Sequence, residues 1–432
     1  MPRLPAERLI EPSGPIDATV RVPGSKSITN RALLIAALAQ GPSELSGPLS
    51  SDDTDVMREA LDQFGVSIDA QSETWRVQGV GGQLAQPNSS LWVQNSGTTA
   101  RFLTAAATLA PGPTTLDGNP RMRERPIVHL LSALEALGAP AEALGEHGCP
   151  PVRVRGGGLP GGSVTIDGSQ SSQYTSAVLL AAPYASQDVV VDFAENLIVS
   201  KPYVDITLKM MRDFGAKADW IEDGNSSSIH VESGMGYQGR PYAIEPDASS
   251  AAYPFCAAAI AGGSIRVAGV PEDSLQSDWR ILELLERMGC QIDRSSDEVS
   301  VTGPDQPLRS LGEVDMNEMP DAVLAYAVVA LFADGPTLIK NVWNLRIKET
   351  DRLAALENEL RKLGARAEAG KDWLRIQPGP LQGAEIDTYD DHRMAMSFSL
   401  AGLRVPGVVI RDPGCVSKTW PDYFDAFGQF SD

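Results

Sequence analysis

A short stretch near the start of the chain combines the beginning of a helix with cationic side chains. A Pro-Gly pair ends an extended run, and from residue 28 to residue 38 the apolar residues recur at helical spacing, which predicts a helix capped by Ser25. Lys26 and Arg31 then lie on its first turn and a half. The free N–H groups of a helix start attract anions, so this pattern indicates a phosphate or carboxylate site.

This stretch has two other interpretations. A nucleotide-binding P-loop needs a glycine five residues before its Gly-Lys pair, and here Ser25 precedes Lys26, so that interpretation is rejected. A solvated basic first turn on an ordinary helix stays open at this point. The helix dipole slightly disfavours basic residues there and does not require them.

A second dense charged group begins at Asn344. Lys348 and Arg352 are four residues apart, and Glu349 lies between these two cations, which should hold its carboxyl group ionised. Thr350 or Asn344 is expected to cap the helix that follows. The alternative is a helix surface covered by salt bridges.

Other candidate side chains stand at predicted helix starts. Asp321 is placed where a helix dipole stabilises a carboxylate, and a plain N-cap is the alternative. Asp391 is also at a helix start, followed by His392 and Arg393. The remaining basic candidates are three alternating arginines, which would share one face if the segment is extended, and one lysine: Arg121, Arg123, Arg125 and Lys418.

Composition excludes several classes of protein. The 432 residues exceed one typical core, so two or more domains are expected. The 36 basic and 56 acidic residues give a net charge of -20, which argues against nucleic acid or an anionic membrane as a partner. No apolar run approaches the roughly 20 residues of a membrane span, and the N-terminal segment has no signal-peptide or transit character. Four cysteines without metal-ligand spacing are expected to be reduced thiols in a cytoplasmic protein.

A polar helix start followed by an alanine-rich helix recurs six times, about 70 to 76 residues apart. Each copy continues with a short β-branched strand and a second helix that ends in an apolar residue plus glycine. Each unit is therefore expected to hold two helices and about four strands with mixed pairing. Chance recurrence of alanine-rich helices would not repeat both helices at near-constant spacing. Six such long units suit two globular domains of three units each better than a solenoid.

With these motifs assembled, the sequence closely resembles the 5-enolpyruvylshikimate-3-phosphate (EPSP) synthase family over nearly the whole chain. The motifs that carry the resemblance follow one another in order: residues 23–31, 51–54, 95–101, 120–126, 171–173, 200–203, 247–250, 315–322, 348–352, 391–396 and 418–423. The resemblance implies an α/β fold of two domains, each built from three βαβαββ-like units. Residues 1–24 with 245–432 would form the first domain and residues 25–244 the second, with the active site in the cleft between them.

The resemblance also implies which residues hold the two substrates. Those matching the shikimate 3-phosphate set are Lys26, Ser27, Arg31, Ser171, Ser172, Gln173, Ser200, Tyr203, Asp321, Asn344 and Lys348. Those matching the phosphoenolpyruvate set are Lys26, Gly97, Thr98, Arg125, Gln173, Arg352, Arg393 and Lys418. Arginine suits bidentate binding of carboxylate and phosphate, and Gly97 would let the backbone approach its ligand closely.

The implied reaction belongs to aromatic amino acid biosynthesis. The 5-hydroxyl of shikimate 3-phosphate adds to C2 of phosphoenolpyruvate, C3 is protonated, and phosphate leaves from a tetrahedral intermediate. Asp321 and Glu349 are the candidate general base and acid, with Lys26 assisting. Glu349 would need a raised pKa to act as an acid at pH 7, and its cationic neighbours oppose that. The resemblance implies no metal or organic cofactor, and a monomer is expected.

Two departures from the family pattern lie close together. The loop that usually reads Gly-Asn-Ala-Gly-Thr is Gln94-Asn95-Ser96-Gly97-Thr98 here, and Phe102 stands where many members have proline. We expect Phe102 to alter the packing under Gly97 and hence the response to glyphosate, which competes at the phosphoenolpyruvate site.

Two rival functions share parts of this pattern. UDP-N-acetylglucosamine enolpyruvyl transferase has a reactive cysteine in the loop before the Arg-Pro pair, whereas Pro120 stands at the comparable position here. A non-catalytic repeat protein that binds phosphorylated ligands would need neither Asp321 nor Glu349 beside its anion-binding residues.

Overall fold

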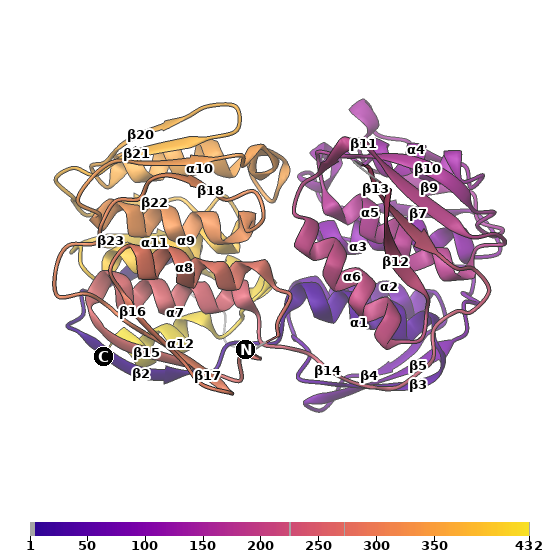
Figure 1. The fold of residues 1–432 in the computed structure, drawn as a ribbon, viewed down its shortest axis with the longest axis horizontal. Helices are drawn as coiled ribbons and strands as arrows, with labels where there is room; N and C mark the ends of the chain where they lie inside the picture. Colours follow the sequence, from indigo (N-terminus) through magenta and orange to yellow (C-terminus); the bar gives the residue numbers. More distant parts are fainter. Residues whose placement is uncertain (1–4, 224–225, 272, 432) are drawn as a thin grey trace. The chain divides into compact units, whose positions relative to one another are not determined.

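The computed structural model of the chain describes residues 5–223, 226–271 and 273–431. The chain divides into two compact units (Figure 1): unit 1 consists of Met1–Pro23 with Glu245–Asp432, and unit 2 of Gly24–Ile244. The described residues form six small sheets, three in each unit. Each sheet contains one parallel pair of strands, and its other strand pairs are antiparallel.

The described part of unit 2 forms six α-helices and three four-stranded sheets. The helices are α1 (Lys26–Leu38), α2 (Asp52–Gln63), α3 (Gly97–Ala106), α4 (Val128–Ala136), α5 (Ser172–Ala181) and α6 (Lys201–Asp213). The strands are β3 (Gln40–Ser46), β4 (Ser67–Asp69), β5 (Thr74–Val80), β6 (Leu91–Trp92), β7 (Thr114–Asp117), β8 (Ala141–Ala143), β9 (Val152–Val154), β10 (Gly162–Gly168), β11 (Val189–Ile198), β12 (Ala218–Asp223), β13 (Ser226–Val231) and β14 (Pro241–Ala243). The sheet orders are β14-β3-β5-β4, β6-β7-β9-β8 and β10-β11-β13-β12.

Unit 1 repeats this plan with one shorter sheet. Its helices are α7 (Ala248–Ala261), α8 (Ile281–Arg287), α9 (Val323–Val329), α10 (Arg352–Lys362), α11 (His392–Gly402) and α12 (Tyr423–Ser431). Its strands are β1 (Glu7–Ile10), β2 (Ile16–Val20), β15 (Gly263–Ala268), β16 (Gln291–Arg294), β17 (Glu298–Thr302), β18 (Gly312–Asp315), β19 (Thr337–Lys340), β20 (Arg366–Ala369), β21 (Leu374–Gln377), β22 (Glu385–Ile386) and β23 (Val408–Arg411). The sheet orders are β16-β17-β15-β2, β18-β19-β21-β20 and β1-β23-β22. The expected four strands are therefore found in five repeats, and the last repeat has three.

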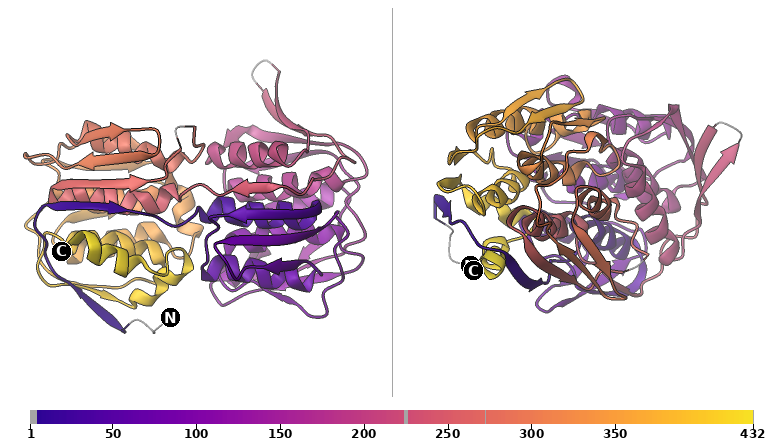
Figure 2. Two further views of the ribbon diagram at one scale, coloured as in Figure 1. Left: turned by 90° about the horizontal axis from the view of Figure 1, so that it is seen from below. Right: turned by 60° about the vertical axis from the view of Figure 1, so that its left-hand side comes forward.

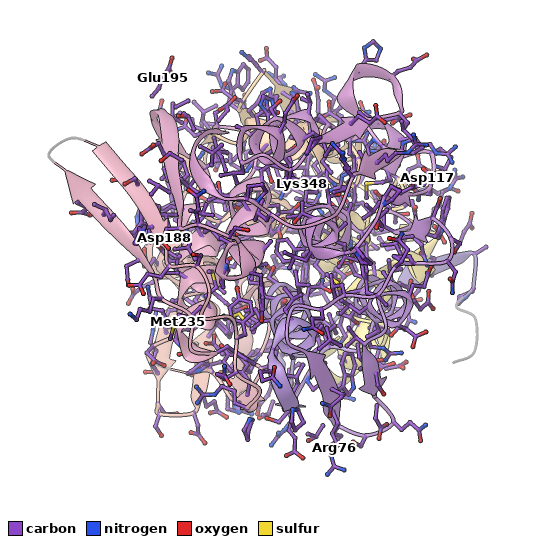
Figure 3. All side chains as sticks on the ribbon, turned by 90° about the vertical axis from the view of Figure 1, so that its right-hand side faces the viewer. Arg76, Asp117, Asp188, Glu195, Met235 and Lys348 are labelled. Atoms are coloured by element: carbon purple, nitrogen blue, oxygen red, sulfur yellow. The ribbon has the colours of Figure 1, made fainter. Side chains whose placement is uncertain are left out.

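The alanine-rich helices form the centre of each unit. Every residue of α3, α7, α9 and α11 is buried, and so are residues 28–38 of α1. A helix that is apolar on all sides belongs in a core, and alanine's small side chain lets neighbouring helices pack at close range. The second helix of each repeat is amphipathic, as in α6, where Val204, Leu208 and Met211 are buried. Charged side chains such as that of Arg76 in β5 project outward from the sheets (Figure 3).

The N-terminal segment is built into unit 1 by strand pairing. Strand β2 pairs in parallel with β15, with Ile16 opposite Gly263 and Val20 opposite Val267, and the two strands run side by side in Figure 2. Pro23 then accepts a hydrogen bond from the backbone N–H of Asp247 at 2.8 Å. The chain leaves unit 1 after Pro23 and returns to it at Glu245.

The predicted helix starts are found, with two differences in their caps. Helix α1 begins at Lys26 as expected, but the side chain of Ser25 makes no capping hydrogen bond. Helix α10 is capped by Asp351, whose carboxylate accepts from the N–H of Ala354, so the expected cap at Thr350 or Asn344 is wrong. Asp391 caps α11 as predicted.

Two glycines allow a strand to cross the end of a core helix. A Cβ atom on Gly79 would lie 2.7 Å from the carbonyl oxygen of Ala36 and closer still to that of Ala39, at the end of α1. A Cβ atom on Gly303, after β17, would overlap the carbonyl oxygen of Ala258 in α7. Neither glycine is in the left-handed region, so the constraint is steric.

We predict that Gly79→Ala and Gly303→Ala each lower the free energy of unfolding by about 2 kcal/mol or more, because backbone carbonyls cannot rotate away as a side chain can. Urea titration of the whole chain measures the change. Gly14→Ala is the matched control, since a Cβ atom there meets nothing within 4 Å. Equal losses in the three variants would contradict the steric explanation.

Candidate functional site

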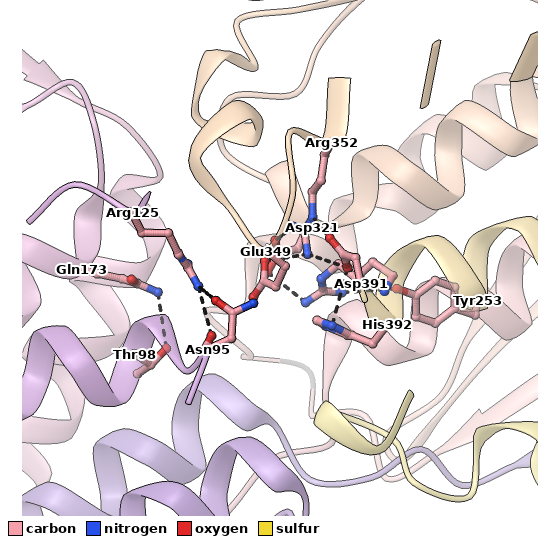
Figure 4. Close-up of polar contacts among 11 residues, drawn as sticks. Asn95, Thr98, Arg125, Gln173, Tyr253, Asp321, Glu349, Arg352, Asp391 and His392 are labelled. Carbon is pink, nitrogen blue, oxygen red and sulfur yellow. Dashed lines mark hydrogen bonds and ion pairs between the residues drawn. The ribbon is translucent and has the colours of Figure 1, made fainter. Parts of the chain in front are cut away.

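The acidic residues singled out in unit 1 gather around Arg352, the first residue of α10 (Figure 4). Its Nε donates to Asp391 at 2.8 Å and its Nη2 donates to the other oxygen of Asp391 at 3.2 Å. Nη2 also lies 3.0 Å from Glu349, and Nη1 donates to Asp321 at 3.0 Å. Three carboxylates therefore surround one guanidinium group whose side chain is only 1% exposed.

These carboxylates govern the charge of Arg352. Burial disfavours the charged guanidinium, but the carboxylates of Asp391, Glu349 and Asp321 outweigh burial and raise the pKa of Arg352 above its usual value. The group is thus a permanent cation at any physiological pH.

Arg393 is the second buried arginine of the group. Its Nη2 donates to Asp321 at 2.9 Å and its Nη1 to the hydroxyl of Tyr253 at 3.4 Å. Burial opposes the charge, yet the carboxylate of Asp321 and other charges hold the pKa of Arg393 well above its usual value. Burial also raises the pKa of Tyr253 to about 12, so this hydroxyl stays protonated.

Asp391 holds the guanidinium of Arg352 and the helix start at Arg393. Its carboxylate is fully buried, holds Arg352 in a fork, and accepts from the backbone N–H of Arg393 at 2.9 Å as the cap of α11. The sequence indicated only the cap. The fork with Arg352 was missed because its partner lies 39 residues away in another repeat.

The other predicted residues of unit 1 lie on neighbouring short turns. Asn344 is buried in a 3-10 turn (Trp343–Ile347), and Lys348 follows it half-buried. Lys418 ends another 3-10 turn (Pro413–Lys418), which packs against α11. The salt-bridged surface considered for this stretch applies to Arg346, which pairs with Asp351 at 2.6 Å, but not to the buried Glu349 and Arg352.

Asp321 differs from a plain N-cap. It lies in a 3-10 turn (Pro320–Ala322) before α9, where Met319 takes the cap position. Its two oxygens instead accept hydrogen bonds from Arg352 and Arg393. The plain N-cap alternative is therefore wrong.

In unit 2, Arg31 is buried among neutral partners. Its Nε donates to Thr207 at 2.7 Å, its Nη1 to the carbonyl of Ser27 at 2.9 Å, and its Nη2 to Ser176 and to the carbonyl of Tyr203 at 3.3 and 3.2 Å. No carboxylate among the described residues forms a salt bridge with it. Burial lowers its pKa to about 10, so it remains cationic at neutral pH. Of its five N–H groups, one on Nη1 is left for a ligand.

The face of Arg31 rests on Phe102. The guanidinium carbon lies 5.1 Å from the centre of the Phe102 ring, which is fully buried in α3. This distance is within the range of a cation–π interaction. The residue that departs from the family pattern therefore touches Arg31 directly, and the expected effect on glyphosate stays a prediction.

Helix starts in unit 2 are joined by side chains. The Nε2 of Gln173 donates to the hydroxyl of Thr98 at 3.3 Å, which links α5 to α3 (Figure 4). Arg125 donates from Nη1 to the backbone and side-chain oxygens of Asn95, both at 3.1 Å. A Cβ atom on Gly97 would overlap the Nη2 of Arg125, so a larger residue there would require the guanidinium group to shift. Asn95 was not among the predicted residues.

The remaining predicted residues of unit 2 lie at the starts of the same helices. Lys26 and Ser27 open α1, Ser172 opens α5, and Tyr203 is in the first turn of α6. Two serines precede helices: Ser171 caps α5 by accepting from the N–H of Gln173, and Ser200 adopts a left-handed conformation with φ of 54° before α6.

Two of the three alternating arginines form ion pairs with nearby acidic residues instead of contacting the helix starts. Residues Met122–Glu124 form a 3-10 turn, so the extended segment considered for Arg121, Arg123 and Arg125 is wrong. Arg121 pairs with Glu124 at 3.0 Å, and Arg123 pairs with Asp117 at 2.5 Å. Only Arg125 is buried beside the helix starts.

Two searches of the described residues gave negative results. No group of three or more histidine, cysteine, aspartate or glutamate side chains there could hold a metal ion. No helix within those residues has both the length and the apolar character needed to cross a membrane.

Comparison with solved structures identifies the fold. EPSP synthase from Acinetobacter baumannii superposes with a TM-score of 0.79 at 27% identity, with 98% of each chain covered. The enolpyruvyl transferase NikO from Streptomyces tendae superposes with a TM-score of 0.78 at 21% identity, over 99% of this chain and 98% of that one. The molecule thus has the enolpyruvyl transferase fold, and the predicted fold class is confirmed.

Sequence comparison narrows the assignment. The family model for EPSP synthase (3-phosphoshikimate 1-carboxyvinyltransferase) matches residues 10–427. A 3-phosphoshikimate 1-carboxyvinyltransferase of Nostoc punctiforme is 46% identical over 417 residues, 96% of both chains, and one of Serratia proteamaculans is 45% identical over 427 residues, 98% of both. The chain belongs to the EPSP synthase family, as the motifs predicted.

We predict that Asp391→Asn lowers the free energy of unfolding by about 3 kcal/mol or more, because an amide turns an N–H donor toward the buried guanidinium of Arg352. Urea titration measures this. Glu313→Gln is the control: its exposed pair with Lys340, at 2.6 Å, should contribute about 0–1 kcal/mol. A loss in Asp391→Asn no larger than in the control would show that the fork is not needed.

Proposed function

We propose that this chain transfers the enolpyruvyl group of phosphoenolpyruvate to the 5-hydroxyl of shikimate 3-phosphate, releasing phosphate, as a step of aromatic amino acid biosynthesis. The full-length family match and the names of the curated relatives support this activity. The observation in the structure that best supports the site is the pair of buried arginines, Arg352 and Arg393, that meet at Asp321. The reaction requires cations for a carboxylate and a phosphate, and a base beside them.

The roles follow from the chemistry of each group. The phosphoenolpyruvate anions bind to the arginines and lysines, because arginine matches carboxylate and phosphate geometry. The residues that do so are Lys26, Arg125, Arg352, Arg393 and Lys418, with Gly97, Thr98 and Gln173 beside them. Shikimate 3-phosphate binds to the hydroxyl, amide and basic groups of Ser27, Arg31, Ser171, Ser172, Ser200, Tyr203, Asn344 and Lys348, with Lys26, Gln173 and Asp321.

Addition and elimination each need one proton transfer at carbon. Asp321 takes the proton of the 5-hydroxyl while the oxygen of that hydroxyl forms a bond to C2. C3 receives a proton in the same step, and the product is the tetrahedral intermediate. Loss of a proton from C3 and breakage of the bond from C2 to the phosphate oxygen then yield the enolpyruvyl ether and phosphate. Glu349 is the proposed proton donor and acceptor at C3, and Lys26 neutralises the charge that develops on the phosphate.

The single N–H left on Arg31 limits its part in binding. One donor gives one directed hydrogen bond to shikimate 3-phosphate, so the position of the guanidinium decides its strength. Phe102 supports that position from behind. The proposed site takes up no metal or organic cofactor, and we propose that the chain acts in the cytoplasm as a monomer of two domains, residues 1–24 with 245–432 and residues 25–244.

We predict that wild type releases phosphate from phosphoenolpyruvate with shikimate 3-phosphate as acceptor, and that Asp321→Asn and Lys26→Met lose about 10²- to 10⁴-fold in kcat. Glu313→Gln, a surface change, should keep the wild-type rate. UDP-N-acetylglucosamine serves as the control acceptor. Phosphate release with that acceptor, or none from a folded protein with either, would refute the proposed function in favour of the rival transferase or of a binding protein.

We predict that Phe102→Leu raises the KM for shikimate 3-phosphate about three- to tenfold and leaves kcat nearly unchanged, because leucine fills the space without offering a ring face to Arg31. Initial rates at saturating phosphoenolpyruvate measure both constants. Phe64→Leu is the matched control, since Phe64 is equally buried in unit 2. A similar rise in KM in both variants would attribute the effect to general packing.

A further inference from the structure

Asp321 occupies the position on the two arginines that an arriving carboxylate would take. One oxygen accepts from Nη1 of Arg352 at 3.0 Å and the other from Nη2 of Arg393 at 2.9 Å. A carboxylate shared between two guanidinium groups in this way is the arrangement expected of a bound substrate carboxylate.

Exposure separates Asp321 from the other acids of the group. Its side chain is 17% exposed, against 9% for Glu349 and 0% for Asp391, while the two arginines are 1% and 5% exposed. Of the three carboxylates, that of Asp321 is therefore the most accessible to solvent. Asp391 and Glu349 contact Nε and Nη2 of Arg352, which leaves Nη1 to Asp321.

The charge balance also opposes a further anion while Asp321 stays in place. The five side chains comprise three carboxylates and two guanidinium groups, so the arginines are already more than neutralised. Binding of another carboxylate then requires that one of the three move, because like charges at this distance repel.

Asp321 is the carboxylate that can move at least cost to the fold. It lies in the short turn Pro320–Ala322 and its side chain caps no helix. Asp391 cannot leave without uncapping α11, and its carboxylate is fully buried. A rotation of the Asp321 side chain breaks its hydrogen bonds to Arg352 and Arg393 and leaves the cap of α11 in place.

We propose that Asp321 is a placeholder anion that the carboxylate of phosphoenolpyruvate displaces from Arg352 and Arg393, and that this displacement is what makes Asp321 available as a base. The inference rests on the proposed function. A carboxylate held by two guanidinium groups is a weak base, and it gains basicity once a substrate carboxylate neutralises them. The base is thereby inactive until phosphoenolpyruvate is bound.

The test is the affinity for phosphoenolpyruvate alone, measured by calorimetry on the whole chain without shikimate 3-phosphate, so that nothing is turned over. Asp321→Asn should bind phosphoenolpyruvate about tenfold more tightly than wild type, although it is inactive. Glu349→Gln is the matched control. It removes the same charge 3.0 Å from the same guanidinium, but from the nitrogen shared with Asp391. Its affinity should change less than that of Asp321→Asn.

The outcomes separate this inference from the proposed function. Unchanged or weaker binding of phosphoenolpyruvate by Asp321→Asn would overturn the placeholder role. An equal gain in affinity in Glu349→Gln would overturn it too, because the effect would then come from net charge alone. Both results leave the proposed function intact if wild type still turns over shikimate 3-phosphate. A wild-type chain that neither binds phosphoenolpyruvate nor releases phosphate would refute the function itself.

Discussion

The fork between Asp391 and Arg352 is the interaction on which the functional group of unit 1 depends. One fully buried carboxylate directs a guanidinium and at the same time caps α11. Because both ends of the fork are shielded from water, neither partner can be lost without leaving a buried charge. The positions of Glu349, Asp321 and Arg393 follow from it, since all three are arranged around the guanidinium that Asp391 holds or the helix that it caps.

Unit 2 holds its arginine by different means. Arg31 has no carboxylate partner among the described residues, and its charge is supported by hydroxyl groups, carbonyl oxygens and the face of Phe102. A cation buried among neutral groups keeps most of its field for an incoming anion, whereas Arg352 is already neutralised by its neighbours. Arg31 in unit 2, without a carboxylate partner, thus attracts an anion permanently. Arg352 in unit 1 is paired with carboxylates, so an incoming anion exchanges with one of them.

What the sequence could predict was set by local physics. Helix α1, the cap at Asp391 and the six alanine-rich helices follow from spacing and from short-range preferences, and they are found. The alternating arginines would share one face only in an extended segment, whereas Met122–Glu124 form a 3-10 turn. Asn119 accepts a hydrogen bond from the N–H of Met122 at this turn, and no periodic sequence pattern predicts it.

Contacts between residues far apart along the chain were beyond what the sequence could predict. Apart from near neighbours, the partners of Arg352 lie 31 to 39 residues away along the chain. Those of Arg31 lie 145 to 176 residues away. Only the resemblance to a family could place those residues in one functional set, and it assigned Asp391 no role. The pairing of Asp321 with both arginines could not be predicted from the sequence, because a charged residue at a helix start is equally consistent with a cap.

The parallel pairing of β2 with β15 determines the order in which the molecule can be completed during synthesis. Strand β2 leaves the ribosome early, yet its partner, with Gly263 opposite Ile16, comes after the whole of unit 2. Unit 2 is continuous in the chain and can close on itself as it emerges, while the first strands of unit 1 wait with an open edge. An exposed edge strand invites pairing with other chains. Until β15 is synthesised, β2 lacks the strand that it pairs with in the described residues.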